Sequence, residues 1–322
     1  MSEETHLQTL LSRYQVRKSK RQKSDFFPYV QAAAHSAGYP CKIEELKYQG
    51  AACRNIIAGD PAQAKVIFTA HYDTCVESPV PNRVYPQNTL ATVLVQLPLI
   101  LGMVALSLGA AWVGARLGGR AGALLAGYTV YIGLFLLLFF FGPANPHTAN
   151  DNTSGVAALL MIMEALPPEK RRDAAFLFFD NEEKGRLGSK AYAKAHPGIT
   201  EGKVLLNLDC VGDGDCFLIV APKSADEKLT ALLHAAFPDD MGKRAIHCSA
   251  ANTQYSSDQK SFPNGVAAAA CRKDRLGYHI PRIHTRRDVI CDESNLAYVR
   301  DGALRLMDHL DTVNSSTGGT NP

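Results

Sequence analysis

The segment AAFLFFDNEEKGRLGS, residues Ala174–Ser189, is the most informative stretch of the sequence for the fold. It begins with six apolar residues, which is typical of a strand that is buried on both faces, and continues with a polar run and a glycine. Strands of this kind belong to sheets that helices cover on both sides. Glu182 and Glu183 follow the strand, at the carboxyl end where the ligand sites of open α/β sheets collect.

Segments outward from this stretch alternate between strand-like and helix-like patterns. Such alternation predicts an α/β fold, with a sheet between two helical layers in a three-layer α/β/α sandwich. The predicted strands are 65–70, 174–179, 203–208, 216–221 and 266–271. The predicted helices are 154–166, 188–196, 226–237 and 294–310.

Two long apolar segments interrupt this alternation. Residues 84–115 and 121–150 contain no Asp, Glu, Lys or Arg, and only RLGGR separates them. Each exceeds the roughly 20 apolar residues that cross a bilayer, so the sequence predicts a transmembrane helical hairpin; a buried helix pair or an apolar lid is the alternative. The predicted organisation is an N-terminal helical segment with the first part of the catalytic domain (1–83), the hairpin (84–146), the rest of the catalytic domain (147–314) and a disordered tail (315–322).

Composition and charge narrow the class of protein further. A net charge of +3 over 322 residues argues against nucleic-acid binding. The eight scattered cysteines without a CxxC pair and the polar N-terminus predict reduced thiols and a cytoplasmic catalytic domain at the cell membrane. Arg116 and Arg120 between the apolar segments favour the opposite orientation. The basic run Arg17–Lys23 is interpreted as a solvated helix face or a patch for anionic lipids.

Histidines and carboxylates follow several of the predicted strands. If those strands are neighbours, their ends converge, and the clustered carboxylates repel one another unless a cation neutralises them. Imidazole and carboxylate are ligands of zinc, with manganese or cobalt as competitors, and five of them suffice for two ions that share one ligand. A remaining glutamate would be free to move a proton. The candidates are His71, Asp73, Asp151, Glu182, Glu183, Asp209 and His284.

The order of the short motifs resembles one known family. HYDT, ANDNTSG, DNEEKGRLGS, NLDCVG, SSDQKSF and RIHTRRD resemble, in that order, the motif series of the co-catalytic di-zinc aminopeptidases of peptidase family M28. The resemblance covers roughly residues 55–288, with the apolar hairpin as an insertion. It implies an α/β sandwich with a mixed, mostly parallel sheet and hydrolysis of N-terminal residues from peptides.

The resemblance also implies a set of metal ligands. Asp151 would bridge two zinc ions. His71 and Asp209 would complete one zinc site, and Glu183 and His284 would complete the other. Because the hairpin separates His71 from Asp151 in the chain, both of its ends are expected close to the site.

Glu182 would then be the general acid/base, and Asp73 would orient a histidine from outside the ligand set. Competing candidates are Asp213 and Asp215 for the role of Asp209, and His279 for that of His284. Cys75 and Cys210 are expected near the metals without a role. The segment Ser257–Gln259 lacks a histidine that the family places in the substrate pocket, which leaves the side-chain preference open.

Three other functions fit parts of the pattern. One is a different metal-dependent amidohydrolase or a carboxypeptidase, since a fold does not fix a substrate. Another is a single-zinc glutaminyl cyclase of the same fold, against which the complete ligand set argues. The third is an inactive membrane-anchored binding protein. The expected partners of the aminopeptidase are peptides with a free N-terminus and the lipid bilayer, and no nucleic acid.

Overall fold

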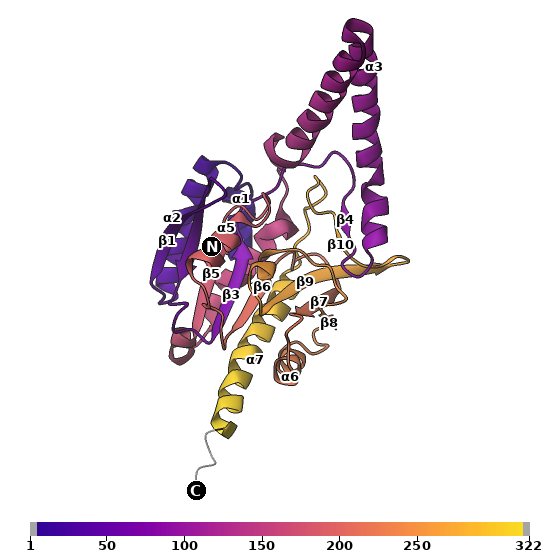
Figure 1. Ribbon diagram of the computed structural model, residues 1–322. Coiled ribbons are helices and arrows are strands. Elements are labelled where there is room, and N and C mark those ends of the chain that lie inside the picture. The colour runs from indigo at the N-terminus through magenta and orange to yellow at the C-terminus, as the bar shows by residue number, and fades with distance from the viewer. Residues whose placement is uncertain (1–4, 318–322) are drawn as a thin grey trace.

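The computed structural model describes residues 5–317. A sheet lies between helical layers, and a long helical hairpin projects from one end of this body (Figure 1). The five predicted strands are all present, so the α/β sandwich is confirmed. They are β3 (Val66–His71), β5 (Ala174–Phe179), β6 (Val204–Leu208), β7 (Cys216–Ala221) and β9 (Gly265–Asp274).

The sheet is parallel at its centre and has antiparallel pairs on both sides, whereas its marginal strand β8 pairs parallel with β7. Strands β5, β3, β6 and β9 lie in that order and run parallel. On one side, the antiparallel pair β1 and β2 continues the sheet beyond β5. On the other side, β10 and β7 both pair antiparallel with β9. The marginal strands are β1 (Cys41–Tyr48), β2 (Ala51–Ala58), β4 (Arg83–Val84), β8 (Arg244–Ser249) and β10 (Gly277–Pro281).

Alternating side chains of the buried strands supply both faces of the sheet. In β5, Phe176 and Phe178 enter the larger core beneath the N-terminal helices, α4, α6 and α7, whereas Leu177 and Phe179 pack toward α5. Burial on both faces explains why the strand is a continuous apolar run. The helices are α1 (His6–Arg13), α2 (Lys20–Ser36), α4 (Gly155–Ala165), α5 (Leu187–Ala195), α6 (Glu227–Ala236) and α7 (Glu293–Thr317), with the 3-10 turns η3 (Pro168–Asp173) and η4 (Asp258–Ser261).

The chain end differs in part from the expectation. Helix α7 continues to Thr317, so it includes the first residues of the predicted tail, and residues 318–322 lie outside the described range.

The apolar insertion forms α3 (Thr89–Leu136), which continues into the π-helical turn η1 (Leu137–Phe141). Gly118 and Gly119 have non-helical backbone angles and divide α3 into two arms, which meet at the tip and diverge toward the body (Figure 1). The segment Thr89–Phe141 is long and apolar enough to cross a membrane, and none of its most apolar stretch of 18 residues is buried within the protein.

The two ends of the hairpin attach to different parts of the body. Asn88 caps the first arm by accepting a hydrogen bond from the Ala91 amide, and its side chain donates to the carbonyl of Leu276 between β9 and β10. The second arm is followed by Ala144, which forms a β-bridge with Val76, five residues beyond His71. Both ends therefore lie near the carboxyl ends of the central strands.

The basic run near the N-terminus is not a uniform surface patch, contrary to both interpretations of it. Arg17 is completely buried, and its guanidinium donates to the carbonyl of Tyr72 and the hydroxyl of Thr153. Lys23 is also buried and pairs with Asp180. These contacts join the N-terminal segment to the loops after β3 and β5. The eight cysteines are all free, as the sequence predicted.

Candidate metal centre and active site

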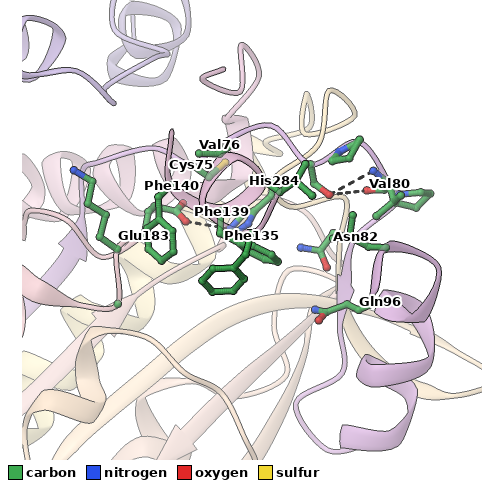
Figure 2. Close-up of a pocket in the computed structure, with 17 residues that line it drawn as sticks. Cys75, Val76, Val80, Asn82, Gln96, Phe135, Phe139, Phe140, Glu183 and His284 are labelled. Carbon is green, nitrogen blue, oxygen red and sulfur yellow. Dashed lines mark hydrogen bonds and ion pairs between the residues drawn. The ribbon is translucent and has the colours of Figure 1, made fainter. Parts of the chain in front are cut away.

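The carboxyl ends of three parallel strands bring the predicted residues together. His71 is the last residue of β3, Asp209 follows β6 directly, and Glu183 lies in the loop after β5. Asp151 lies in the π-helical turn η2 (Ala149–Ser154), which precedes α4. His284 comes from the loop that follows β10 and reaches Glu183 (Figure 2).

Asp151 lies between the two histidines. Its Oδ1 is 3.4 Å from Nε2 of His71, and its Oδ2 is 3.0 Å from Nε2 of His284. Nε2 of His71 is 3.6 Å from Oδ1 of Asp209, and Nε2 of His284 is 3.3 Å from Oε2 of Glu183. One carboxylate thus faces two separate sets of donors, each with one histidine and one further carboxylate.

The residues present fit a pair of divalent cations. Oε1 of Glu183 and Oδ1 of Asp209 are buried and have no hydrogen-bond partner among residues 5–317. Buried carboxylate oxygens without partners are costly unless a cation or a proton satisfies them. Ligand atoms of His71, Asp151 and Asp209 all lie within 4.8 Å of one another, and imidazole with carboxylate is a zinc donor set.

The electrostatics of the cluster show the same need for positive charge. Burial disfavours the charged form of His71, but the nearby carboxylates of Asp151 and Asp209 outweigh burial and raise its pKa well above the usual value. Burial likewise opposes protonation of His284, yet Glu183 and Asp151 raise its pKa to about 10. Burial raises the pKa of Glu183 to about 8. Protons therefore neutralise this cluster when cations do not, and binding of cations would displace them.

Asp73 orients the glutamate pair as well as the histidine. Nδ1 of His71 is 3.1 Å from the Asp73 carbonyl oxygen and 3.7 Å from its carboxylate. The carboxylate accepts hydrogen bonds from the backbone amides of Glu182 at 2.9 Å and Glu183 at 3.3 Å. Asp73 therefore links the loops after β3 and β5, which carry three of the candidate residues.

Two further residues that sequence reasoning missed hold the Asp151 turn in place. The Asp288 carboxylate accepts from the amides of Asn150 at 2.7 Å and Asp151 at 3.0 Å. Asn152 donates to the carbonyl of Leu208 and accepts from the amides of Gly155 and Cys210. The only sequence signal was their place within RIHTRRD and ANDNTSG, because these partners are distant in the chain.

Asp258 is a buried carboxylate that acts electrostatically on Glu182. Neither of its oxygens has a hydrogen-bond partner among the described residues, and burial raises its pKa to about 7. Burial also raises the pKa of Glu182 well above its usual value. The charge of His71 opposes this increase, and the charge of Asp258 adds to it. Gln259, in the place of the family's histidine, bonds instead to Asn207 and the carbonyl of Tyr255.

The competing candidates have other partners. The His279 ring packs against Tyr85 in a tilted arrangement, with the ring centroids 5.1 Å apart, and its Nδ1 lies 3.5 Å from Oδ2 of Asp274. Asp213 pairs with Arg272 and Arg282. Cys75 is the one cysteine whose sulfur lies within 4.8 Å of the ligand atoms of both Glu183 and His284 among the described residues.

Solved structures share this fold. They include the LapA aminopeptidase of Legionella pneumophila (14% identity, TM-score 0.57, covering 95% of this chain and 69% of that one). A zinc-dependent exopeptidase from Parabacteroides distasonis is also similar (16% identity, TM-score 0.57, covering 94% of this chain and 95% of that one). So is the glutaminyl cyclase of Porphyromonas gingivalis (19% identity, TM-score 0.58, covering 95% of this chain and 96% of that one). A search of curated protein sequences gave no match.

The sequence itself defines the family. The model of peptidase family M28 matches residues 136–318, more than half of the chain, and the chain belongs to that family. The family resemblance inferred from the motifs is therefore confirmed. Because the structural neighbours include both exopeptidases and glutaminyl cyclases, the family and fold define a peptidase-type zinc site without fixing the reaction.

Proposed function

We propose that the protein is a metallo-aminopeptidase that holds two zinc ions and removes N-terminal residues from peptides. The observation that carries this proposal is the position of Asp151, whose two oxygens face His71 and His284 separately. A shared carboxylate with one imidazole and one carboxylate on either side supplies five ligands for two ions. A one-ion cyclase would leave His71 and Asp209 as a buried set of ligands without a role.

The ions, when bound, would polarise the peptide carbonyl and make a water more acidic. Glu182 is the residue that we assign to proton transfer: it accepts the proton of the attacking water and donates it to the departing amine. Burial raises the pKa of Glu182 above its usual value, and a raised pKa makes a carboxylate a stronger base. The Asp73 carboxylate holds the backbone amides of Glu182 and Glu183 in place. Each glutamate side chain can therefore keep its own role.

The experiment compares purified wild type with Glu182→Gln on short peptides with free and blocked N-termini. We expect free peptides to be cleaved and the variant to lose roughly 10²- to 10⁴-fold in kcat, the range for a general acid/base, while its zinc content stays at the wild-type level. Lys194→Gln, at an exposed position of α5 that does not line the pocket beside the site, is the control and should retain activity. Equal cleavage of blocked and free peptides would contradict the aminopeptidase assignment.

We further propose that α3 and η1 span the bilayer as a hairpin, with the catalytic body in the cytoplasm. The exposed apolar side chains of both arms support the span, and the free cysteines support the orientation. The two tip arginines favour the reverse. A cysteine introduced at Leu117, an exposed tip residue, should be labelled from outside intact cells, whereas one at Lys228 in the body should not. The opposite labelling pattern would reverse the orientation.

A further inference from the structure

A pocket of about 230 Å³ lies between the candidate metal centre and the base of the hairpin (Figure 2). Glu183 and His284 form part of its lining. Side chains from both arms form another part, so the insertion contributes directly to the space beside the proposed metals. The lining residues from the hairpin are Gln96, Leu99, Phe135, Leu138, Phe139 and Phe140.

The two arms are in close contact toward the tip and diverge toward the body (Figure 1). A Cβ atom placed on Gly114 would lie 2.3 Å from the carbonyl oxygen of Gly122, so no larger residue fits there. Small residues allow such close helix contacts within a membrane. At the base, the arms end at separate attachment points, and large side chains such as Phe135 and Phe139 replace the glycines.

Two amide side chains give this apolar space a polar side. Asn82 and Gln96 both line the pocket, and Figure 2 shows them apart from the phenylalanine cluster. Oδ1 of Asn82 is buried and has no hydrogen-bond partner among residues 5–317. A few polar groups in an apolar pocket are typical of ligand sites, where they fix the orientation of the ligand. A peptide backbone offers the donor that Asn82 lacks.

The position of the pocket relates it to the bilayer. At about 1.5 Å per residue, the first arm from Thr89 to Leu117 is roughly 43 Å long. With the tip at one interface of the bilayer, Gln96 and Leu99 lie about 32 and 27 Å along the arm from Leu117, close to the other edge of a hydrocarbon core of about 30 Å. The outward side chains of the same turns, Leu97 and Leu101, are exposed and apolar.

We propose that this pocket receives the N-terminal end of a peptide that is itself held in the bilayer. This proposal rests on the proposed aminopeptidase function and names its substrate class. The apolar residues of the peptide contact Leu99 and Phe139, its backbone bonds to Asn82, and its first peptide bond reaches the metal centre. Such a peptide reaches the site past the exposed Leu97 and Leu101 of the first arm and the pocket residues Leu99 and Phe139.

The test measures binding in liposomes with the Glu182→Gln variant, so that it does not depend on turnover. Two peptides share one N-terminal sequence, and one of them also carries an apolar segment that partitions into the bilayer. Phe139→Ala removes a pocket side chain. Phe141→Ala is the matched control because Phe141 lies in the same turn and is more exposed, but does not line the pocket.

We expect Phe139→Ala to weaken binding of the bilayer peptide by about tenfold, as loss of one buried aromatic contact implies, and Phe141→Ala to leave it unchanged. The bilayer concentrates the apolar peptide equally for Phe139→Ala and Phe141→Ala, because both variants are measured in the same liposomes. A difference between the two variants therefore reports on the pocket. Equal effects of the two substitutions, or equal binding of both peptides by the unsubstituted pocket, would overturn the substrate class. Tight, Phe139-dependent binding without hydrolysis by wild type would support the pocket and refute the aminopeptidase.

Discussion

The metal centre and the hairpin depart from ordinary protein solvation in opposite ways. The centre buries carboxylates whose oxygens lack partners, such as those of Glu183 and Asp209. The hairpin exposes large apolar side chains along both arms, such as Leu108 and Leu124. Without a bound cation, burying such carboxylates costs free energy. Without a covering partner, exposing so large an apolar surface to water also costs free energy. Each therefore indicates the environment that would make it favourable, cations in the first region and lipid in the second.

The largest expected effect comes from removing the carboxylate shared by both halves of the centre. Asp151→Ala should lower kcat by at least about 10³-fold, because electrostatic stabilisation is usually the largest single contribution to catalysis. Zinc content should fall with it, since both sets of donors lose a ligand. Asp215→Asn, an exposed carboxylate in the loop after Asp209, serves as the control and should change neither. If Asp151→Ala retained its zinc, the bridging role would be wrong.

The next effect concerns the hairpin. Leu106→Arg places a charge on the exposed face of the first arm, which should cost about 2.5–3.5 kcal/mol of insertion free energy. The measurement is the fraction of protein that stays in the membrane after alkaline extraction. Leu117→Arg adds the same charge at the tip and should leave that fraction unchanged. Identical behaviour of both variants would indicate a lid outside the membrane.

A smaller effect, on the free energy of unfolding, is expected to differ between two arginines of the same basic run. Arg17→Met removes a buried guanidinium that bonds to Tyr72 and Thr153, and should lower the free energy of unfolding by about 1–3 kcal/mol, the cost of unpaired buried groups. Arg21→Met, at a solvated position, should change it by less than about 0.5 kcal/mol. Thermal unfolding in detergent distinguishes them. Equal stabilities would mean that the Arg17 contacts contribute nothing net.

Sequence patterns were sufficient where burial is uniform. The central strands are apolar on both faces, so β5 could be located from its residues alone. Strand β1, CKIEELKY, was missed because it lies at the sheet margin and carries charged residues throughout. The burial of Arg17 and Lys23 could not be predicted either, because their partners Thr153 and Asp180 are distant in the chain.

The candidate site shows the same division. The candidate ligands and their order along the chain are visible in the motifs, and the structure brings His71, Asp151, Glu183, Asp209 and His284 to one place. The roles of Asp288 and Asn152 were not visible, since each depends on hydrogen bonds between separate loops. The pocket wall was also missed, because an apolar segment indicates lipid or core and gives no sign that Phe139 lies beside His284.

The proposed two-zinc centre is tested most directly by the metal content of the purified protein, measured by elemental analysis on wild type, Glu182→Gln and His284→Ala. We expect two zinc ions per chain in wild type and in Glu182→Gln, and a clear loss in His284→Ala. Wild-type protein that stays free of metal after incubation with zinc, or a loss in Glu182→Gln as large as that in His284→Ala, would contradict it.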